Sequence, residues 1–321
     1  MKGVREERIK SNGIWMKVAE KGDGPMVILL HGFPETSFSW RHQIEFLSES
    51  GFHVVAPDLR GYSDSDSPPR PDSYSILHLA GVIGLLDHYN APQAFVVGHD
   101  WGAQIGWHLS LFRPDRVKGF ISLSVPYFPR NPLLKPIQFF NANFGDGFYI
   151  SQFQEPGRAR RLEAAFARYD CLTVMKKFLL ITSTNNLVAP PGMEIIDHLQ
   201  TPPTIPEWIA EEELQVYAEK FQKSGFTGPL SYYRAMDLNW ELTRPWQDSK
   251  ITVPTKFIIG NKDIGYEGAN GTNAYVNGDV FKRFVPDLDI IVLDGHHFIQ
   301  QEKPKEVSDE ILSFLTRLLS T

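Results

Sequence analysis

The sequence has 321 residues, of which 42% are hydrophobic and 22% charged, and its formal net charge at pH 7 is -6. This length and composition fit one large domain with an insertion, and the negative charge argues against nucleic acid or an anionic membrane as a partner. No window approaches the ~18 apolar residues of a membrane-spanning helix and the amino terminus has no apolar signal segment, so we expect a cytoplasmic protein without membrane insertion.

Strands and helices alternate in the first part of the chain. Residues 14–18 alternate apolar and polar side chains, as in a half-exposed strand, and residues 26–30 and 53–56 are continuous apolar runs typical of strands buried on both faces. Helical spacing of apolar residues predicts helices over 40–47 and 75–89. This alternation indicates βαβ units with a parallel sheet covered on both faces.

The next strand leads into the most informative motif. An apolar strand at 95–97 runs into the sequence GHDWG at 98–102, and a helical pattern follows over 103–109. This layout is typical of a nucleophile elbow, G-x-S-x-G, with Asp100 at the position where serine usually stands. Taken alone, the two glycines could equally mark an ordinary turn with a solvated aspartate. A further strand is predicted over 119–125.

The pattern then changes between residues 127 and 246. This segment has no short apolar strand runs and instead shows helical patterns, proline pairs and many aromatic residues. Strands return at 256–260 and 289–293, and an amphipathic helix is predicted over 307–319. We therefore expect an α/β fold with a mostly parallel central sheet flanked by helices and interrupted by a helical cap. The predicted core is 1–126 and 247–321, and the predicted cap is 127–246.

Three polar residues follow buried strands: Asp100, Asp263 and His297. Sheets of this kind bind ligands beyond the carboxyl ends of their strands, so these side chains are expected to meet there. Each one alone could be an ordinary turn or surface residue. Together they have the order nucleophile, acid, histidine that is found in α/β-hydrolase triads. The neighbouring His99 and His296 are expected to form local hydrogen bonds only.

The residue types predict a two-step reaction. A carboxylate nucleophile attacks carbon and leaves an ester on the enzyme. His297, oriented by Asp263, would then deprotonate the water that hydrolyses this ester. Hydrolysis creates an oxyanion, and the backbone N–H groups of Phe33 and Trp101 are the expected donors. Because Asp100 is already charged at neutral pH, the histidine is needed only for the second step.

Five runs of sequence carry a family resemblance: HGFPE at 31–35, GHDWGA at 98–103, YISQFQEPG at 149–157, SYYR at 231–234 and GHHF at 295–298. With these runs, and over nearly its whole length, the chain resembles the epoxide hydrolases of the α/β-hydrolase fold, most of all the soluble plant enzymes. The resemblance implies conversion of a hydrophobic epoxide and water to a vicinal diol.

In that family two cap tyrosines hydrogen-bond the epoxide oxygen and act as acids, and the resemblance assigns these roles to Tyr149 and Tyr233. A phenol is neutral at pH 7 and can donate to a developing alkoxide. Tyr232 is a rival of Tyr233, because neighbouring residues on a helix point ~100° apart and only one should face the site. The residue before Arg234 fits the family pattern, which favours Tyr233.

Three further residues are assigned secondary roles at the site. Glu35 is expected to help order the active-site water, and His31 and Phe153 are placed on the substrate side. The aromatic residues of the insertion favour a hydrophobic epoxide, either a fatty-acid or a terpenoid one. No metal or cofactor is expected, because Cys171 is the only cysteine and no H-E-x-x-H pattern occurs.

Two other functions remain as alternatives. A haloalkane dehalogenase resembles this fold and also has an elbow Asp followed by Trp, but it needs halide donors such as an Asn where Phe33 stands or a second Trp in the insertion. Hormone receptors of the same fold resemble serine-elbow proteins, which Asp100 argues against. The sequence leaves open whether the protein is a monomer or a homodimer.

Overall fold

An eight-stranded sheet forms the centre of the molecule, in the order β1-β2-β4-β3-β5-β6-β7-β8. The structure is a computed structural model that describes residues 3–154, 156–267 and 271–320, with only the backbone for 156–160. The strands are β1 (Arg5–Ser11), β2 (Ile14–Lys21), β3 (Met26–Leu30), β4 (His53–Pro57), β5 (Ala94–His99), β6 (Val117–Leu123), β7 (Thr255–Gly260) and β8 (Leu288–Leu293). Strands β3 to β8 run parallel and the first two pair antiparallel, which confirms the mostly parallel sheet.

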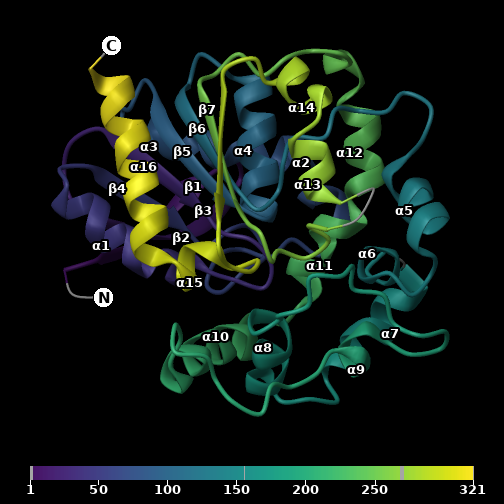
Figure 1. Cartoon of the computed structure of the whole chain (residues 1–321). Coiled ribbons are helices and arrows are strands. Elements are labelled where there is room, and N and C mark those ends of the chain that lie inside the picture. The colour runs from purple at the N-terminus through teal and green to yellow at the C-terminus, as the bar shows by residue number, and fades with distance from the viewer. Residues whose placement is uncertain (1–2, 155, 268–270, 321) are drawn as a thin grey trace.

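Helices cover both faces of the sheet (Figure 1). On one face α1 (Arg41–Glu49) and α16 (Pro304–Leu319) pack against Val27 and Leu29 of β3. On the other face α3 (Ile83–His88) and α4 (Trp101–Phe112) pack with Ile28 and Leu30 of the same strand. Successive side chains of a strand point to opposite faces, so a strand covered on both faces is apolar at every position.

The helix predicted over 75–89 is helical from Ile76 to His88, but its middle has 3-10 geometry. It consists of α2 (Ile76–Leu79), η3 (Ala80–Val82) and α3, and η2 (Pro71–Tyr74) precedes it. The turn between β1 and β2 adds side-chain hydrogen bonds to two carbonyls of this stretch: Ser11 Oγ donates to Gly81 O (2.7 Å) and Asn12 Nδ2 to His78 O (3.0 Å). Strand β1, which supplies Ser11, was not predicted from the sequence.

The helical segment between β6 and β7 contains eight helices in its described part. They are α5 (Pro136–Phe144), α6 (Tyr149–Gln152), α7 (Pro156–Phe166), α8 (Cys171–Leu179), α9 (Ile195–His198), α10 (Glu211–Ser224), α11 (Thr227–Arg234) and α12 (Met236–Leu242). In Figure 1, α7 to α10 lie together below the sheet. We call this segment the cap; its exact boundaries remain a prediction. Within the residues described, no helix combines the length and apolar character needed to cross a membrane.

One short element, η4 (Arg244–Trp246), ends the cap segment. The others belong to the core domain: η1 (Ser37–Trp40), α13 (Thr272–Val276), α14 (Asp279–Phe284) and α15 (Ile299–Glu302). Helix α15 begins two residues after His297 and contacts η1, and its Gln300 and Gln301 bond to Glu35 in the loop before η1. The loops that follow β3 and β8 are therefore in contact.

Helix α10 attaches the cap to the core. Glu213 on this helix pairs with Arg41 of α1 (2.6 Å), and the hydroxyl of Tyr217 donates to Gln301 Oε1 (2.9 Å). Lys220, one turn further, lies 3.6 Å from the buried carboxylate of Asp58. Removing one partner of a buried ion pair is costly because the other charge stays buried, so these contacts keep α10 in place.

Gly102 sets how closely α4 approaches β3. A Cβ at this position would lie 2.0 Å from Leu30 O, a backbone atom that cannot move aside. We expect Gly102→Ala to lower the free energy of unfolding by about 1–3 kcal/mol or more, as overpacking does, and to reduce activity through a displaced elbow. Urea unfolding measured alongside activity tests this.

The matched control is Gly51→Ala, where the φ of 88° strains an alanine but no atom lies within 4 Å. It should lose about 1–2 kcal/mol of stability, the usual cost of a left-handed backbone, and keep its activity. Equal stability and activity in both variants would contradict the importance of the close approach.

Candidate active site

Asp100 stands at the sharp turn between β5 and α4. Its backbone has φ 52° and ψ -116°, an uncommon conformation for a residue with a side chain. The turn is tight because a Cβ at Gly98 would lie 2.3 Å from Gly102 O. This geometry lifts the carboxylate above the carboxyl edge of the sheet, as in a nucleophile elbow.

His297 and Asp263 lie beside the Asp100 carboxylate. His297 Nδ1 is 2.6 Å from Asp263 Oδ1, and His297 Nε2 is 3.8 Å from Asp100 Oδ2. The first distance is a strong hydrogen bond, whereas the second is too long for one. The Ile264 N–H donates to the same Asp263 oxygen (2.6 Å). The structure thus brings the three predicted residues together. Asp263 is hydrogen-bonded to His297, and Oδ2 of Asp100 lies near the ring without such a bond.

The charges of this group shift the titration of its members. Burial disfavours the charged imidazolium, but Asp263 and Asp100 outweigh it and raise the pKa of His297 well above its ordinary value. Burial likewise disfavours the Asp100 carboxylate, but His297, His99 and the Phe33 N–H hold the pKa of Asp100 below its ordinary value. Asp100 is therefore an anion and His297 a cation in the resting site near neutral pH.

The loop after β3 supplies one predicted backbone donor. The Phe33 N–H donates to Asp100 Oδ1 at 2.7 Å. Trp101 is the first residue of α4, and the first N–H groups of a helix have no partner inside the helix. Its N–H is consequently available for the second donor role, which stays a prediction.

Glu35 is fully buried and hydrogen-bonds the loop that follows β3. Its Oε2 accepts from the Gly32 N–H (3.0 Å) and is 2.7 Å from His99 Nδ1. Its Oε1 accepts from the side chains of Gln300 (2.7 Å) and Gln301 (3.0 Å). Burial opposes its charge, but His99 and the Gly32 N–H keep the pKa of Glu35 below its ordinary value. The water-ordering role of Glu35 stays a prediction, while its contacts fix the loop after β3 that carries Phe33.

The local role expected for His99 is wrong. Its Nδ1 bonds to Glu35, 64 residues earlier, and its Nε2 bonds to the carbonyl of His297 (2.8 Å), 198 residues later. Ser124 Oγ donates to the same carbonyl (2.9 Å). These two residues fix the backbone of the histidine loop and were missed by sequence reasoning. Their signal was only that His99 ends the elbow strand β5 and Ser124 follows β6, the strand next to it. For His296 the expectation holds, since it bonds to Glu302, six residues away.

The two predicted cap tyrosines lie within electrostatic reach of Asp100. Their rings pack against each other edge to face, with centroids 6.1 Å apart. Burial, followed by the negative charge of Asp100, raises the pKa of both Tyr149 and Tyr233. The ring of Tyr233 also contacts Trp101, the residue after the nucleophile, at 5.1 Å.

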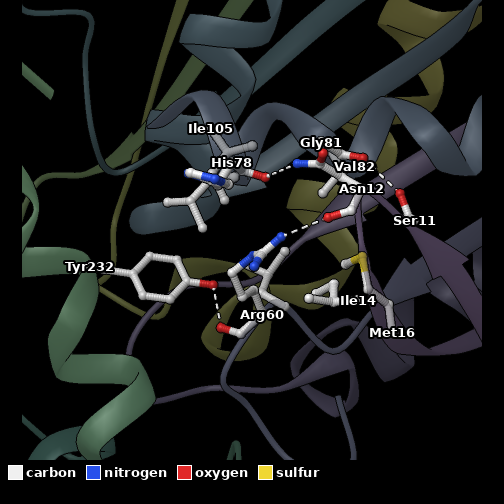
Figure 2. Close-up of a pocket in the computed structure, with 12 residues that line it drawn as sticks. Ser11, Asn12, Ile14, Met16, Arg60, His78, Gly81, Val82, Ile105 and Tyr232 are labelled. Carbon is white, nitrogen blue, oxygen red and sulfur yellow. Dashed lines mark hydrogen bonds between the residues drawn. The ribbon is translucent and has the colours of Figure 1, made fainter. Parts of the chain in front are cut away.

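Tyr232 points elsewhere. Its hydroxyl donates to Arg60 O at 2.7 Å, beside a small cavity between the β1–β2 turn and α2 (Figure 2). The pKa of Tyr232 is raised by burial and by the neighbouring Tyr74, with no contribution from Asp100. Of the two adjacent tyrosines, therefore, Tyr233 is the one within electrostatic reach of the nucleophile.

Phe153 and His31, which were predicted to lie on the substrate side, have different surroundings in the structure. Phe153 is fully buried and packs its ring against Phe33 (5.8 Å), Tyr149 (5.6 Å) and Tyr233 (4.9 Å), behind the cap tyrosines. His31 is also fully buried, but its Nε2 accepts from the Leu59 N–H (2.9 Å) and its Nδ1 bonds to Gly32 O (2.9 Å). Both ring nitrogens of His31 are thus used by the backbone, and it supports the loop instead of touching a substrate. Glu155 of the YISQFQEPG run lies outside the described residues.

No group of three or more His, Cys, Asp or Glu side chains that could hold a metal occurs in the described part of the chain. The site instead combines an anionic carboxylate, a protonated histidine with its acid, one backbone donor on the nucleophile and two neutral phenols. This set can attack an electrophilic carbon, protonate a leaving oxygen and activate a water.

Comparison with known proteins identifies close relatives. The family model described as alpha/beta hydrolase fold matches residues 25–304. The chain is 47% identical to "Epoxide hydrolase 1" of Siraitia grosvenorii, covering 98% of this chain and 99% of that protein. It is 38% identical to "Epoxide hydrolase A" of Mycobacterium tuberculosis, covering 98% of each. The crystal structure of an epoxide hydrolase from Vigna radiata superposes with a TM-score of 0.93 at 43% identity, covering 99% of both chains.

The raised pKa of His297 has a testable consequence. A group whose pKa is raised by folding stabilises the fold fully below its unfolded pKa, about 6.5 for His, and this contribution is lost as the pH rises through the folded pKa. Asp263→Asn should therefore lower the pKa of His297 and cost more stability at about pH 6 than at about pH 9. NMR titration of the ring and urea unfolding at both pH values measure this.

Asp115→Asn is the control, because this exposed carboxylate pairs with Arg113 far from the site. It should leave the titration of His297 unchanged. A wild-type His297 that titrates at its ordinary value, or an Asp263→Asn stability loss equal at both pH values, would contradict the electrostatic description.

Proposed function

Because the chain belongs to the epoxide hydrolases of the alpha/beta hydrolase fold, we propose that it converts a hydrophobic epoxide to a vicinal diol through a covalent ester on Asp100. The observation that carries the proposal is that Asp100 Oδ2 lies 3.8 Å from Nε2 of the His297–Asp263 pair, while the charge of Asp100 acts on both cap phenols. Nucleophile, base and acids are thus arranged around one small volume, as such a reaction requires.

In the first step Asp100 Oδ2 attacks a ring carbon, the carbon–oxygen bond of the epoxide breaks, and the oxygen takes a proton from a phenol. Oδ1, which accepts from the Phe33 N–H, becomes the carbonyl oxygen of the ester. The raised pKa of Tyr149 and Tyr233 keeps both phenols neutral before the attack, so each can donate a hydrogen bond.

In the second step His297 Nε2 takes a proton from water and the water oxygen bonds to the ester carbonyl carbon. The bond to Oδ2 then breaks as Oδ2 takes this proton, and the remaining proton of the new carboxyl group passes to His297. The negative charge develops on Oδ1, where Phe33 N–H already donates, and the Trp101 N–H is the proposed second donor. One such donor is worth about 10²–10³ in rate in measured oxyanion holes. The diol leaves with the former Asp100 oxygen, and Asp100 retains one oxygen from water.

Ester formation itself prepares the histidine for the second step. In the resting site Asp100 is one of the two carboxylates that raise the pKa of His297. An ester carries no charge, so its formation removes that contribution and lowers the pKa of His297 toward the range of a useful base. His297 then gives up its proton, which returns to the phenolate formed in the first step. The phenol is restored, and the neutral Nε2 can act on water.

The proposed substrate is hydrophobic because the surroundings of the nucleophile are aromatic. The ring of Phe33 packs edge to face against Phe153, Phe178 and Tyr233 at 5.8, 5.3 and 5.7 Å. These contacts build an apolar wall beside Asp100, as ligand sites for apolar molecules usually have. The dehalogenase alternative has no such support, because the relatives reported above are named epoxide hydrolases.

We expect His297→Gln to accumulate the ester, since this variant keeps the nucleophile and loses the base. Intact-protein mass spectrometry after mixing with a styrene-type epoxide should show a mass increase equal to that epoxide, with diol formation nearly abolished. Asp100→Ala is the matched control and should show neither adduct nor diol. An adduct on Asp100→Ala, or halide release from a 1-haloalkane without diol formation by the wild type, would refute the proposal.

The rate of ester formation should distinguish Tyr149 and Tyr233 from the neighbouring Tyr232. Tyr149→Phe and Tyr233→Phe each remove one acid, and we expect the single-turnover rate of ester formation to fall by about 10²–10⁴, the usual size of acid catalysis. Tyr232→Phe removes a hydrogen bond to Arg60 O and should cost only about 1 kcal/mol of stability. A slower ester formation in Tyr232→Phe than in Tyr233→Phe would reverse the assignment.

A further inference from the structure

A short backbone pairing holds the acid tyrosine of α6. The Tyr149 N–H donates to Leu187 O (3.0 Å), the Ala189 N–H donates to Gly147 O (2.8 Å), and Phe148 forms an antiparallel bridge with Val188. Helix α6 is only four residues long, so it gives its first residue little support of its own. The pairing is therefore what fixes the backbone of Tyr149.

The same segment reaches the core beside the triad acid. Gly265 N–H donates to Thr184 O at 2.9 Å. Gly265 is two residues after Asp263, whose carboxylate bonds to His297. We name residues 184–189 the strap: at one end it binds the loop of the triad acid and at the other the backbone of the cap phenol.

The hydroxyl of Tyr149 has no hydrogen-bond partner among the described residues. Its ring packs against those of Phe148 (4.8 Å), Phe153 (5.6 Å) and Tyr233 (6.1 Å). The ring of Tyr233, in contrast, packs against core residues too: Phe33 (5.7 Å) and Trp101 (5.1 Å). The position of the Tyr149 hydroxyl consequently depends on its backbone more than that of Tyr233 does.

Gly147 makes this pairing possible. A Cβ at position 147 would lie 2.1 Å from Ala189 O, a strap backbone atom. Any side chain would push the 147–149 backbone away from the strap. A displacement near 1 Å at a reacting group can cost about 10²-fold in rate.

We propose that Gly147 is a positioning residue for the reaction: it seats the 147–149 backbone on the strap and so places the Tyr149 phenol over Asp100. The inference rests on the proposed function, in which that phenol donates to the epoxide oxygen. Gly147 touches neither substrate nor reacting atoms and acts only through Tyr149. The strap ties this placement to the loop of Asp263, so the acid of the first step keeps a fixed distance from the base pair of the second.

A double-mutant cycle tests the proposal. The single-turnover rate of ester formation is measured for the wild type, Gly147→Ala, Tyr149→Phe and the double variant. Gly147→Ala should slow ester formation about 10- to 10²-fold. In the Tyr149→Phe background the same change should have almost no further effect, because the group that it displaces is already gone. A merely structural role would reduce the rate equally in both backgrounds.

Gly145→Ala is the matched control, two residues earlier at the end of α5. Its φ of 74° strains an alanine, but no atom lies within 4 Å of the added Cβ. Its rate of ester formation should stay within about twofold of the wild type, because the strain is local to the helix end and the strap pairing is intact. A loss equal to that of Gly147→Ala would overturn the proposal.

A second variant covers the case in which Gly147→Ala fails to fold. Ala189→Pro removes the N–H that donates to Gly147 O and turns the ring Cδ toward that oxygen, so it breaks the same pairing from the strap side. The extended backbone of the preceding Val188, which forms the bridge, suits a following proline. This variant should slow ester formation in the same non-additive way.

The outcomes separate the two proposals. A wild-type rate in Gly147→Ala and Ala189→Pro, or rate losses that add to that of Tyr149→Phe, would overturn the positioning role and leave the proposed function intact. A wild-type rate in Tyr149→Phe would remove the phenol from the mechanism and the positioning role with it.

Discussion

The forced backbone at Asp100 is the constraint on which the rest of the site depends. With φ 52° and ψ -116°, the residue occupies a conformation that costs free energy and persists only where the surroundings leave no alternative. Those surroundings are β5, hydrogen-bonded to a neighbouring strand on each side, and α4, which starts at the next residue. Gly98 and Gly102 allow strand and helix to approach this closely. The central sheet thus supplies the stability that offsets a strained nucleophile.

Placing that nucleophile above the sheet creates a second problem, since buried charges are costly unless they are paired. In this site each buried carboxylate has a partner: His297 lies between Asp263 and Asp100, and Glu35 is hydrogen-bonded to His99. The Glu35–His99 pair also joins the oxyanion loop to the carbonyl of His297. One network therefore fixes the donor loop and the base loop relative to each other, although their residues are far apart in the sequence.

The parts of this arrangement that sequence reasoning could predict are those with local patterns. The strand runs, the elbow and the residues directly after strands are visible within short windows, and the strand-end rule then brings Asp100, Asp263 and His297 together. Contacts between distant segments leave no such pattern. The bonds from His99 to Glu35 and from Ser11 to Gly81 O depend on which loops meet after folding.

The core contributes charged groups to the site and the cap contributes neutral phenols, and the same electrostatics explain this division. The core holds the charged groups of the proposed mechanism, and the cap contributes phenols whose pKa is raised by burial and by Asp100. A cationic acid in the cap would pair with Asp100 and weaken the nucleophile, whereas a neutral phenol can donate without doing so. The cap residues must then be placed by packing and backbone contacts, because they have no charge to attract them. In the mechanism proposed here, the strap at 184–189 and the ion pair between Arg41 and Glu213 are the means by which the core places them.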